Sequence, residues 1–299
     1  MDTLSIKKVS KQYGNFVAVD DVTFDVPQGV IYGLLGPNGA GKTSLIRIIN
    51  SITMADRGEI RFNGEPLRTS HQQRIGYLPE ERGLYRKMNV QDQLEYLGQL
   101  KGMDRSKVRE RISYWYEVFG MEGWEAKKIE DLSKGMQQKV QFVATVLHEP
   151  DLLILDEPFS GLDPVNTNLL KDEIRKLKEN GTTILFSTHR MEQVEEICER
   201  IALINRGALV LEGDIEAIKE NYKDHLFEFV FEGDRLPDLE QVEMLSVTGS
   251  HRVTIQFEDL EEANQQMQIW MNEGVMIREF REILPSINDI FIKLVTSSD

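Results

Sequence analysis

The chain has 299 residues, of which 40% are hydrophobic and one, Cys198, is a cysteine. This length suits about two packed domains, and a single cysteine excludes a disulfide framework and favours a reducing compartment. The net charge of −15 argues against a surface for nucleic acid or anionic lipid. No apolar stretch approaches a membrane span of about 20 residues, and the first residues carry no signal-peptide pattern.

The first 220 residues alternate between short apolar runs and amphipathic stretches, which predicts strands alternating with helices. We expect strands at residues 4–9, 22–26, 30–35, 59–62, 74–78, 152–155, 182–187, 201–205 and 208–211. We expect helices at residues 44–50, 165–178 and 191–200. The dipeptide Asn63-Gly64 is typical of a hairpin turn, here between the strands at 59–62 and 74–78. The alternation favours a mainly parallel α/β sheet, whose ligands bind at the carboxyl ends of its strands.

Residues 90–147 are predicted to be helical, because their apolar side chains recur at spacings of three or four. Leu94, Leu97 and Leu100 form one such series, and Trp115 belongs to another. Aromatic residues at helical spacing are more often core residues than cofactor-stacking residues. We therefore interpret Trp115 as a packing residue.

The residues after Gly213 have a different pattern. We expect helices at 215–222, 260–271 and 287–295, the last capped by Ser286, and strands at 226–231, 243–247, 252–257 and 275–281. This order predicts a small α+β domain at residues 223–299, after a first domain at residues 1–220. Residues 216–299 carry 7 Lys or Arg against 18 Asp or Glu, so this second domain is the more acidic one.

The segment that follows the strand at 30–35 fits G-x-x-x-x-G-K-[ST] at every fixed position. It reads Gly36-Pro37-Asn38-Gly39-Ala40-Gly41-Lys42-Thr43, and Ser44 begins the predicted helix. Glycines let the backbone curl round a polyphosphate, and the curled amides and the helix N-terminus turn positive dipole ends towards it. Lys42 adds a full charge for the outer phosphates, and the Thr43 hydroxyl can ligate Mg²⁺. The segment is therefore a predicted phosphate-binding loop.

Two carboxylates, Asp156 and Glu157, follow the apolar strand at 152–155. Asp156 can hold Mg²⁺ through water, opposite Thr43. Glu157 lies one residue further out, where it can act as general base on an attacking water. The combination of an acidic pair after a strand with an upstream phosphate loop predicts a nucleotide-hydrolysing site.

These motifs resemble those of the ATP-binding subunit of an ABC transporter, over residues 4–220 of the chain. The resemblance implies a P-loop NTPase of the ABC ATPase type with an inserted helical subdomain at about residues 86–150. The segment Leu132-Ser133-Lys134-Gly135-Met136-Gln137-Gln138 is similar to the signature segment of that family, usually LSGGQ. Ser133 and Gly135 keep a hydroxyl and amides at a helix start, which suit a γ-phosphate. Lys134 and Met136 depart from the usual glycine and glutamine.

Three further positions match the family. Ser160-Gly161-Leu162-Asp163 resembles its D-loop, which reaches across a dimer, and Ser187-Thr188-His189 resembles its switch histidine. The resemblance implies that His189 contacts the γ-phosphate and orients the water of Glu157. It also implies that Tyr13 lies under the adenine ring, where a tyrosine can stack.

One departure from the family lies at Glu80, where the usual residue is a glutamine that contacts Mg²⁺ and couples to the membrane partner. Glutamate keeps the ligand oxygen, adds a charge and loses the amide donor. The following Glu81-Arg82-Gly83-Leu84-Tyr85 resembles the branch of bacterial sodium-export and drug-export proteins, and the C-terminal domain resembles one found there.

The resemblance implies that one chain cannot work alone, because its single phosphate loop and single signature segment face away from each other. A complete site then needs two chains head to tail, as a homodimer with two ATP molecules and Mg²⁺ at its interface. The membrane-spanning part is expected to be a separate permease subunit, gripped by the helical region. We expect the chain at the cytoplasmic face of the membrane, with no nucleic-acid partner and no insertion into lipid.

Two other interpretations stay open. The first is a soluble ABC-type ATPase of translation or repair, which the acidic charge disfavours. The second is a nucleotide-sensing module in which Glu80, Lys134 and Met136 have weakened hydrolysis.

Overall fold

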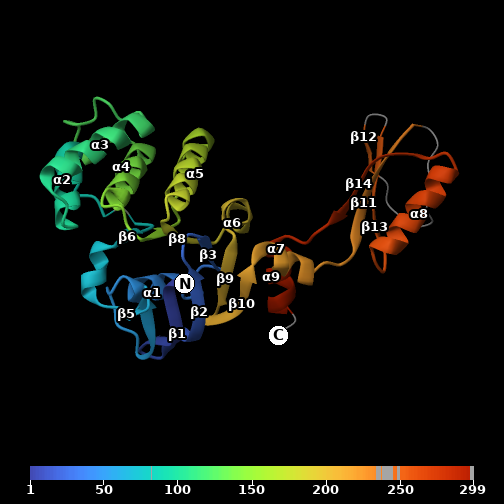
Figure 1. Cartoon of the computed structure of the whole chain (residues 1–299), viewed down its shortest axis with the longest axis horizontal. Helices are drawn as coiled ribbons and strands as arrows, with labels where there is room; N and C mark the ends of the chain where they lie inside the picture. Colours follow the sequence, from blue (N-terminus) through green and yellow to red (C-terminus); the bar gives the residue numbers. More distant parts are fainter. Residues whose placement is uncertain (82, 234–236, 238–244, 248–249, 297–299) are drawn as a thin grey trace. The chain divides into compact units, whose positions relative to one another are not determined.

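The computed structural model describes the chain except residues 82, 234–236, 238–244, 248–249 and 297–299. It divides into two compact units, Met1–Asp214 and Ile215–Asp299 (Figure 1). Helix α7 (Ile215–Asn221), which was expected at the end of the first domain, falls in the second unit. Among the described residues, none of the helices has the length and apolar character needed to cross a membrane.

A six-stranded sheet forms the middle of the first unit, in the order β10-β9-β3-β8-β7-β6 (Figure 1). Its strands are β3 (Ile31–Leu35), β6 (Ile75–Leu78), β7 (Leu152–Asp156), β8 (Thr183–Thr188), β9 (Arg200–Asn205) and β10 (Ala208–Asp214). All neighbours are parallel except β10, which pairs antiparallel with β9. Every residue of β3, β7 and β8 is buried, which explains their mainly apolar sequences. Leu35 pairs with Thr188 and Asp156 with Ser187, so the carboxyl ends of these strands share one edge.

Two helices connect the last parallel strands, α5 (Pro164–Glu179) between β7 and β8, and α6 (Met191–Ile197) between β8 and β9. The predicted helix at 191–200 is therefore too long, because Cys198 already has extended backbone. Cys198 itself is buried.

An antiparallel sheet, β2-β1-β4-β5, covers a second face of the core. Its strands are β1 (Asp2–Tyr13), β2 (Phe16–Pro27), β4 (Arg57–Phe62) and β5 (Glu65–Pro66). The predicted partner of the Asn63-Gly64 turn was wrong: the turn joins β4 to the short β5, whereas β6 belongs to the parallel sheet. Positive φ at both residues suits a tight hairpin turn. Helix α1 (Lys42–Ile49) packs its apolar side chains into the core that both sheets share.

The helical region consists of α2 (Val90–Leu100), α3 (Arg105–Phe119) and α4 (Lys134–Val146), which lie together in Figure 1. Of two short 3-10 turns, Thr69–Gln73 precedes β6 and Ile129–Asp131 precedes α4. Trp115 is buried against Phe119 and Phe142, with ring centroids 5.6 and 5.9 Å away, which confirms its packing role. Leu100 differs from the prediction, because at the last turn of α2 its side chain is 64% exposed.

The second unit is the predicted small α+β domain. Its antiparallel sheet has the order β12-β13-β11-β14, with strands β11 (Leu226–Glu232), β12 (Leu245–Val247), β13 (Ser250–Gln256) and β14 (Met276–Ile283). Helix α8 (Leu260–Asn272) places Trp270 on the phenylalanines of β11, and Ser286 caps α9 (Ile287–Thr296). Residues 243–244 of the predicted strand at 243–247 lie outside the described residues.

Candidate nucleotide-binding and hydrolysis site

The predicted phosphate loop runs from the end of β3 into α1. Inside its curl, the Lys42 ammonium donates to the carbonyl oxygens of Gly36 and Pro37, at 2.6 and 3.1 Å. A Cβ at Gly36 would lie 2.1 Å from the Ile204 oxygen, and a Cβ at Gly41 would lie 2.1 Å from the Ala18 oxygen. Both glycines also have positive φ, so the neighbouring backbone leaves no room for a side chain at either position.

A cavity of about 410 Å³ opens over this loop. Its lining combines the loop with the carboxyl ends of β7 and β8 and with Glu80, which follows β6. The lining residues are Phe16, Ala18, Asn38, Gly39, Ala40, Gly41, Lys42, Thr43, Ser44, Glu80, Asp156, Glu157 and His189. The fold thus brings together the predicted phosphate, magnesium and hydrolysis residues at the sheet edge where ligands are expected.

Asp156 is the last residue of β7 and only 3% of it is exposed. Its Oδ1 accepts a hydrogen bond from the Ser187 hydroxyl at 2.8 Å. Burial raises the pKa of Asp156, and the charges of Glu157 and Glu80 raise it further, against the bond from Ser187. A buried carboxylate beside further carboxylates and the Thr43 hydroxyl is a set of hard oxygen donors, which fits Mg²⁺.

Lys42 is the positive counterpart of these carboxylates. Burial lowers the pKa of its ammonium, whereas Glu157, Asp156 and Glu80 raise it. The cation is 7% exposed and already aimed along the loop, so little side-chain freedom remains to be lost when an anion binds.

Glu157 is held by the end of the neighbouring strand β8. Its Oε1 accepts from the His189 backbone N–H at 2.8 Å and lies 2.7 Å from His189 Nδ1, and its Oε2 accepts from the Thr188 hydroxyl at 3.1 Å. Its backbone is left-handed, with φ of 51°, a strained conformation that is enriched at functional sites. The carboxylate is therefore fixed at the cavity with His189 beside it, a geometry suited to a general base.

The aromatic residue that lines the cavity is Phe16, whereas Tyr13 is not among the lining residues. The two face each other across the turn of the β1–β2 hairpin, where Tyr13 pairs with Phe16. Phe16 is 61% exposed, and the Lys11 ammonium lies 5.5 Å from the Tyr13 ring centroid. Phe16 was missed because the motif points to the residue before the turn, and only the fold brings Phe16 to the phosphate loop.

The signature residues and the D-loop lie away from this cavity. The Ser133 hydroxyl caps α4 by accepting from the Met136 N–H at 3.3 Å, and Asp163 caps α5 by accepting from the Asn166 N–H at 3.0 Å. A Cβ at Gly135 would lie 3.7 Å from the Gly161 oxygen, so the two segments are neighbours. Neither segment lines the cavity, and Ser133 and Lys134 are exposed.

Comparison with known proteins agrees with this geometry. Residues 19–160 match the family model described as ABC transporter, and residues 213–295 match that of the C-terminal domain of DrrA1-3-like ATP-binding proteins. An uncharacterised ABC transporter ATP-binding protein of Bacillus subtilis (strain 168), YhaQ, is 41% identical over 98% of both chains. Nod factor export ATP-binding protein I of Burkholderia lata is 34% identical over 73% of both chains.

A solved structure described as the ATP binding subunit of an ABC transporter has the same fold. It is 31% identical, with a TM-score of 0.70, and covers 74% of this chain and 93% of its own. Members of this family bind and hydrolyse ATP. The chain belongs to the family of ABC transporter ATP-binding proteins.

Proposed function

We propose that this chain is the motor of an exporter, in which two copies close on two ATP molecules and hydrolysis drives a separate transmembrane subunit. Lys42 and the loop amides bind the outer phosphates, and Thr43, Asp156 and Glu80 hold Mg²⁺. The metal neutralises charge on the phosphates when it is bound. Glu157 accepts a proton from the attacking water while His189 and Thr188 fix its carboxylate.

The observation that best supports ATP hydrolysis is the set of hydrogen bonds that holds the Glu157 carboxylate. Three hydrogen bonds from Thr188 and His189 hold its two oxygens, and all come from the strand end beside Asp156. A mere solvated turn would leave such a glutamate free to move. A fixed carboxylate facing a phosphate loop is instead arranged to receive one proton from one direction.

The requirement for two copies follows from where the signature lies. The chain contains one phosphate loop and one signature segment, and Ser133 is not among the residues that line the cavity. The exposed start of α4, a helix N-terminus with the positive end of its dipole, suits a phosphate that belongs to another copy. Two chains in head-to-tail contact therefore form two complete sites, each lined by both copies.

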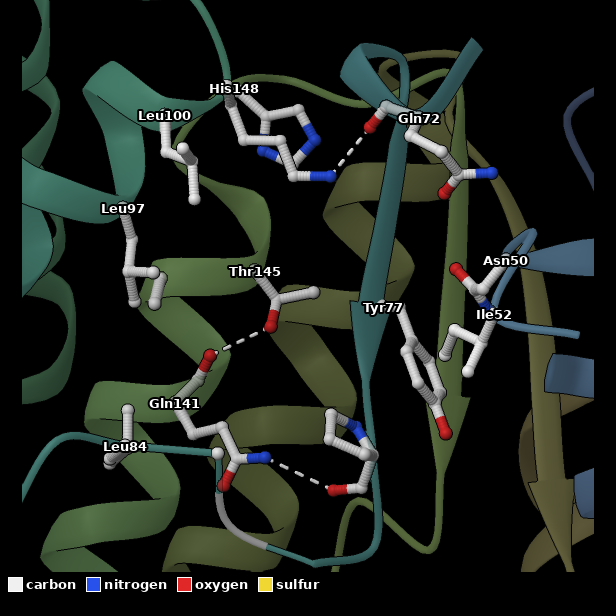
Figure 2. Close-up of a pocket in the computed structure, with 14 residues that line it drawn as sticks. Asn50, Ile52, Gln72, Tyr77, Leu84, Leu97, Leu100, Gln141, Thr145 and His148 are labelled. Carbon is white, nitrogen blue, oxygen red and sulfur yellow. Dashed lines mark hydrogen bonds between the residues drawn. The ribbon is translucent and has the colours of Figure 1, made fainter. Parts of the chain in front are cut away.

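A groove of about 370 Å³ lies between the helical region and the core, and it is the feature that favours a protein partner (Figure 2). Leu97 and Leu100 of α2 line one wall, and Ile52 and Tyr77 of the core line the other. A second cavity shares Ile52 and Tyr77 with the groove and Thr43 and Asp156 with the nucleotide site. A helix of the transmembrane subunit in this groove would lie close to the residues that bind magnesium.

Export is the direction that the relatives favour, since one of them is named as an export protein. Docking on the groove holds the chain at the cytoplasmic face of the membrane, where its acidic surface needs no contact with lipid.

The decisive experiment replaces Glu157 by glutamine in the full chain and measures phosphate release and elution volume with Mg²⁺ and ATP. We expect hydrolysis to fall by about a hundredfold or more, because the base is lost, and an ATP-bound dimer to accumulate. Glu192→Gln is the matched control, since Glu192 is an exposed residue of the first turn of α6. Hydrolysis by Glu157→Gln at the wild-type rate would show that the base lies elsewhere.

A further inference from the structure

Helix α4 carries two buried glutamines one turn apart. Gln138 and Gln141 are each 4% exposed, and their spacing of three places them on neighbouring positions of one helix face. A buried carboxamide is costly unless its donors find acceptors. Each of these side chains reaches out of the helical region to a backbone carbonyl of the nucleotide-binding core.

The Gln141 amide reaches the loop that carries Glu80. Its Nε2 donates to the Pro79 oxygen at 3.1 Å, as the dashed line in Figure 2 shows. Because a peptide unit is planar, the Pro79 carbonyl and the Cα of Glu80 belong to one rigid group of atoms. The bond from Gln141 therefore fixes the plane from which the Glu80 side chain departs.

The Gln138 amide reaches the turn that carries Glu157. Its Nε2 donates to the Pro158 oxygen at 2.8 Å, in a buried position. Pro158 is the second residue of a turn that the Ser160 N–H closes on the Glu157 oxygen at 3.1 Å. The proline ring fixes φ, so only ψ stays free at this residue, and the direction of its carbonyl sets ψ. Gln138 removes this last freedom next to Glu157.

We infer that Gln138 and Gln141 are positioning residues for the hydrolysis site, Gln138 for Glu157 and Gln141 for Glu80. The inference rests on the roles proposed above for these two carboxylates. Both acceptors are carbonyl oxygens, so the facing atoms are amide nitrogens. The helix that begins at the signature serine, Ser133, thereby holds two loops of its own chain's site, and a shift of α4 moves both carboxylates together.

The test uses Gln138→Met and Gln141→Met in the full chain, because methionine keeps the length of glutamine and removes its donor. We measure steady-state ATP hydrolysis against ATP and against Mg²⁺. For Gln138→Met we expect kcat to fall about tenfold or more, with the half-saturating Mg²⁺ concentration unchanged. For Gln141→Met we expect that concentration to rise several-fold, with kcat at saturating Mg²⁺ within about twofold of the wild type.

The matched control is Lys139→Met, which lies between the two on α4. Its ammonium donates to the Phe119 oxygen inside the helical region at 3.1 Å, and wild-type values are expected. If both glutamine variants change kcat and the Mg²⁺ dependence in the same way, or change neither, their role is packing only and the inference is wrong. Where a methionine variant does not fold, asparagine replaces it, because this draws the amide back by about 1.5 Å and leads to the same two outcomes.

The two proposals fail separately. If Gln138→Met and Gln141→Met do not differ in their effects on kcat and on the Mg²⁺ dependence, while Glu157→Gln is inactive, only the positioning roles are overturned. Full activity of Glu157→Gln overturns the proposed base itself.

Discussion

At the scale of single residues, His148 is a histidine that the fold keeps neutral. It lies in the groove of Figure 2, with its Nε2 3.3 Å from the Ile75 oxygen and its Nδ1 buried without a partner among the described residues. Burial, together with the charge of the nearby Lys101 ammonium, lowers the pKa of its imidazole from the usual 6.5 to about 4. Lys101 is itself committed to the core, since it donates to the Gln72 and Ile75 oxygens at 2.6 and 2.7 Å.

We predict that His148 makes the chain sensitive to mild acid. Its folded-state pKa is depressed, so the unfolded chain binds the proton first as the pH falls. The contribution of neutral His148 to the free energy of unfolding is fully present above pH 6.5 and is lost as the pH drops towards 4. The melting temperature of the wild type should therefore fall more steeply between pH 7 and 4.5 than that of His148→Gln, in which this group no longer titrates. Parallel curves for the two proteins would contradict the assignment.

At the scale of elements, the β1–β2 hairpin presents two aromatic residues, one on each side of its turn. Phe16 lines the nucleotide cavity, whereas the Lys11 ammonium lies near the ring of Tyr13. Stacking of a base on an aromatic ring is worth about 1–3 kcal/mol by alanine substitution.

We predict that Phe16→Ala weakens ATP binding by about five- to 150-fold, the fold-change that such a stacking energy implies. Tyr13→Ala should weaken it less, because Tyr13 does not line the cavity of the single chain. Fluorescent-nucleotide titration of both variants decides between them. A larger loss in Tyr13→Ala would restore the position that the sequence motif indicates.

Other elements of the first unit illustrate what could be predicted from sequence. Buried parallel strands such as β3 and β7 were recognisable because all their residues face apolar surroundings, and the phosphate loop because its backbone demands fixed residue types. The turn at Asn63-Gly64 was recognisable as local chemistry, but the strand that it joins to β4 depends on the sheet.

Other misses have the same cause. The helical spacing of Leu100 gives no sign that its last turn projects from the protein. The partners of Gln138 and Gln141 lie 20 and 62 residues away in the sequence, so no local pattern contains these bonds. The sequence thus predicts local geometry and leaves long-range contacts to the fold.

At the scale of the whole molecule, the proposed engine consists of two chains, each of which completes the site of the other. This arrangement can be tested with two defective chains. Lys42→Ala removes the cation of the phosphate loop. Gly135→Asp places a negative charge at the start of α4, where a Cβ meets its nearest atoms at an ordinary 3.7 Å and an acidic residue suits the helix end.

We predict that each variant alone is inactive and that an equal mixture regains activity. Half of the dimers in the mixture contain both variants, and in each of these both defects fall on one site. About a quarter of the wild-type number of sites is then intact. Phosphate release from the mixture, compared with each variant at the same total concentration, gives the answer. A mixture as inactive as its components would mean that each chain completes its own site.

The close approach of backbone at Gly36 and Gly41 has a consequence for reading genomes. These glycines are demanded by the Ile204 and Ala18 oxygens, two parts of the same chain, whether or not a nucleotide ever arrives. A related protein that no longer hydrolyses ATP must therefore still have both glycines in order to keep this fold. Their presence therefore indicates only that the fold is intact. Residues such as Lys42 and Glu157 are the ones that distinguish an active ATPase from an inactive relative.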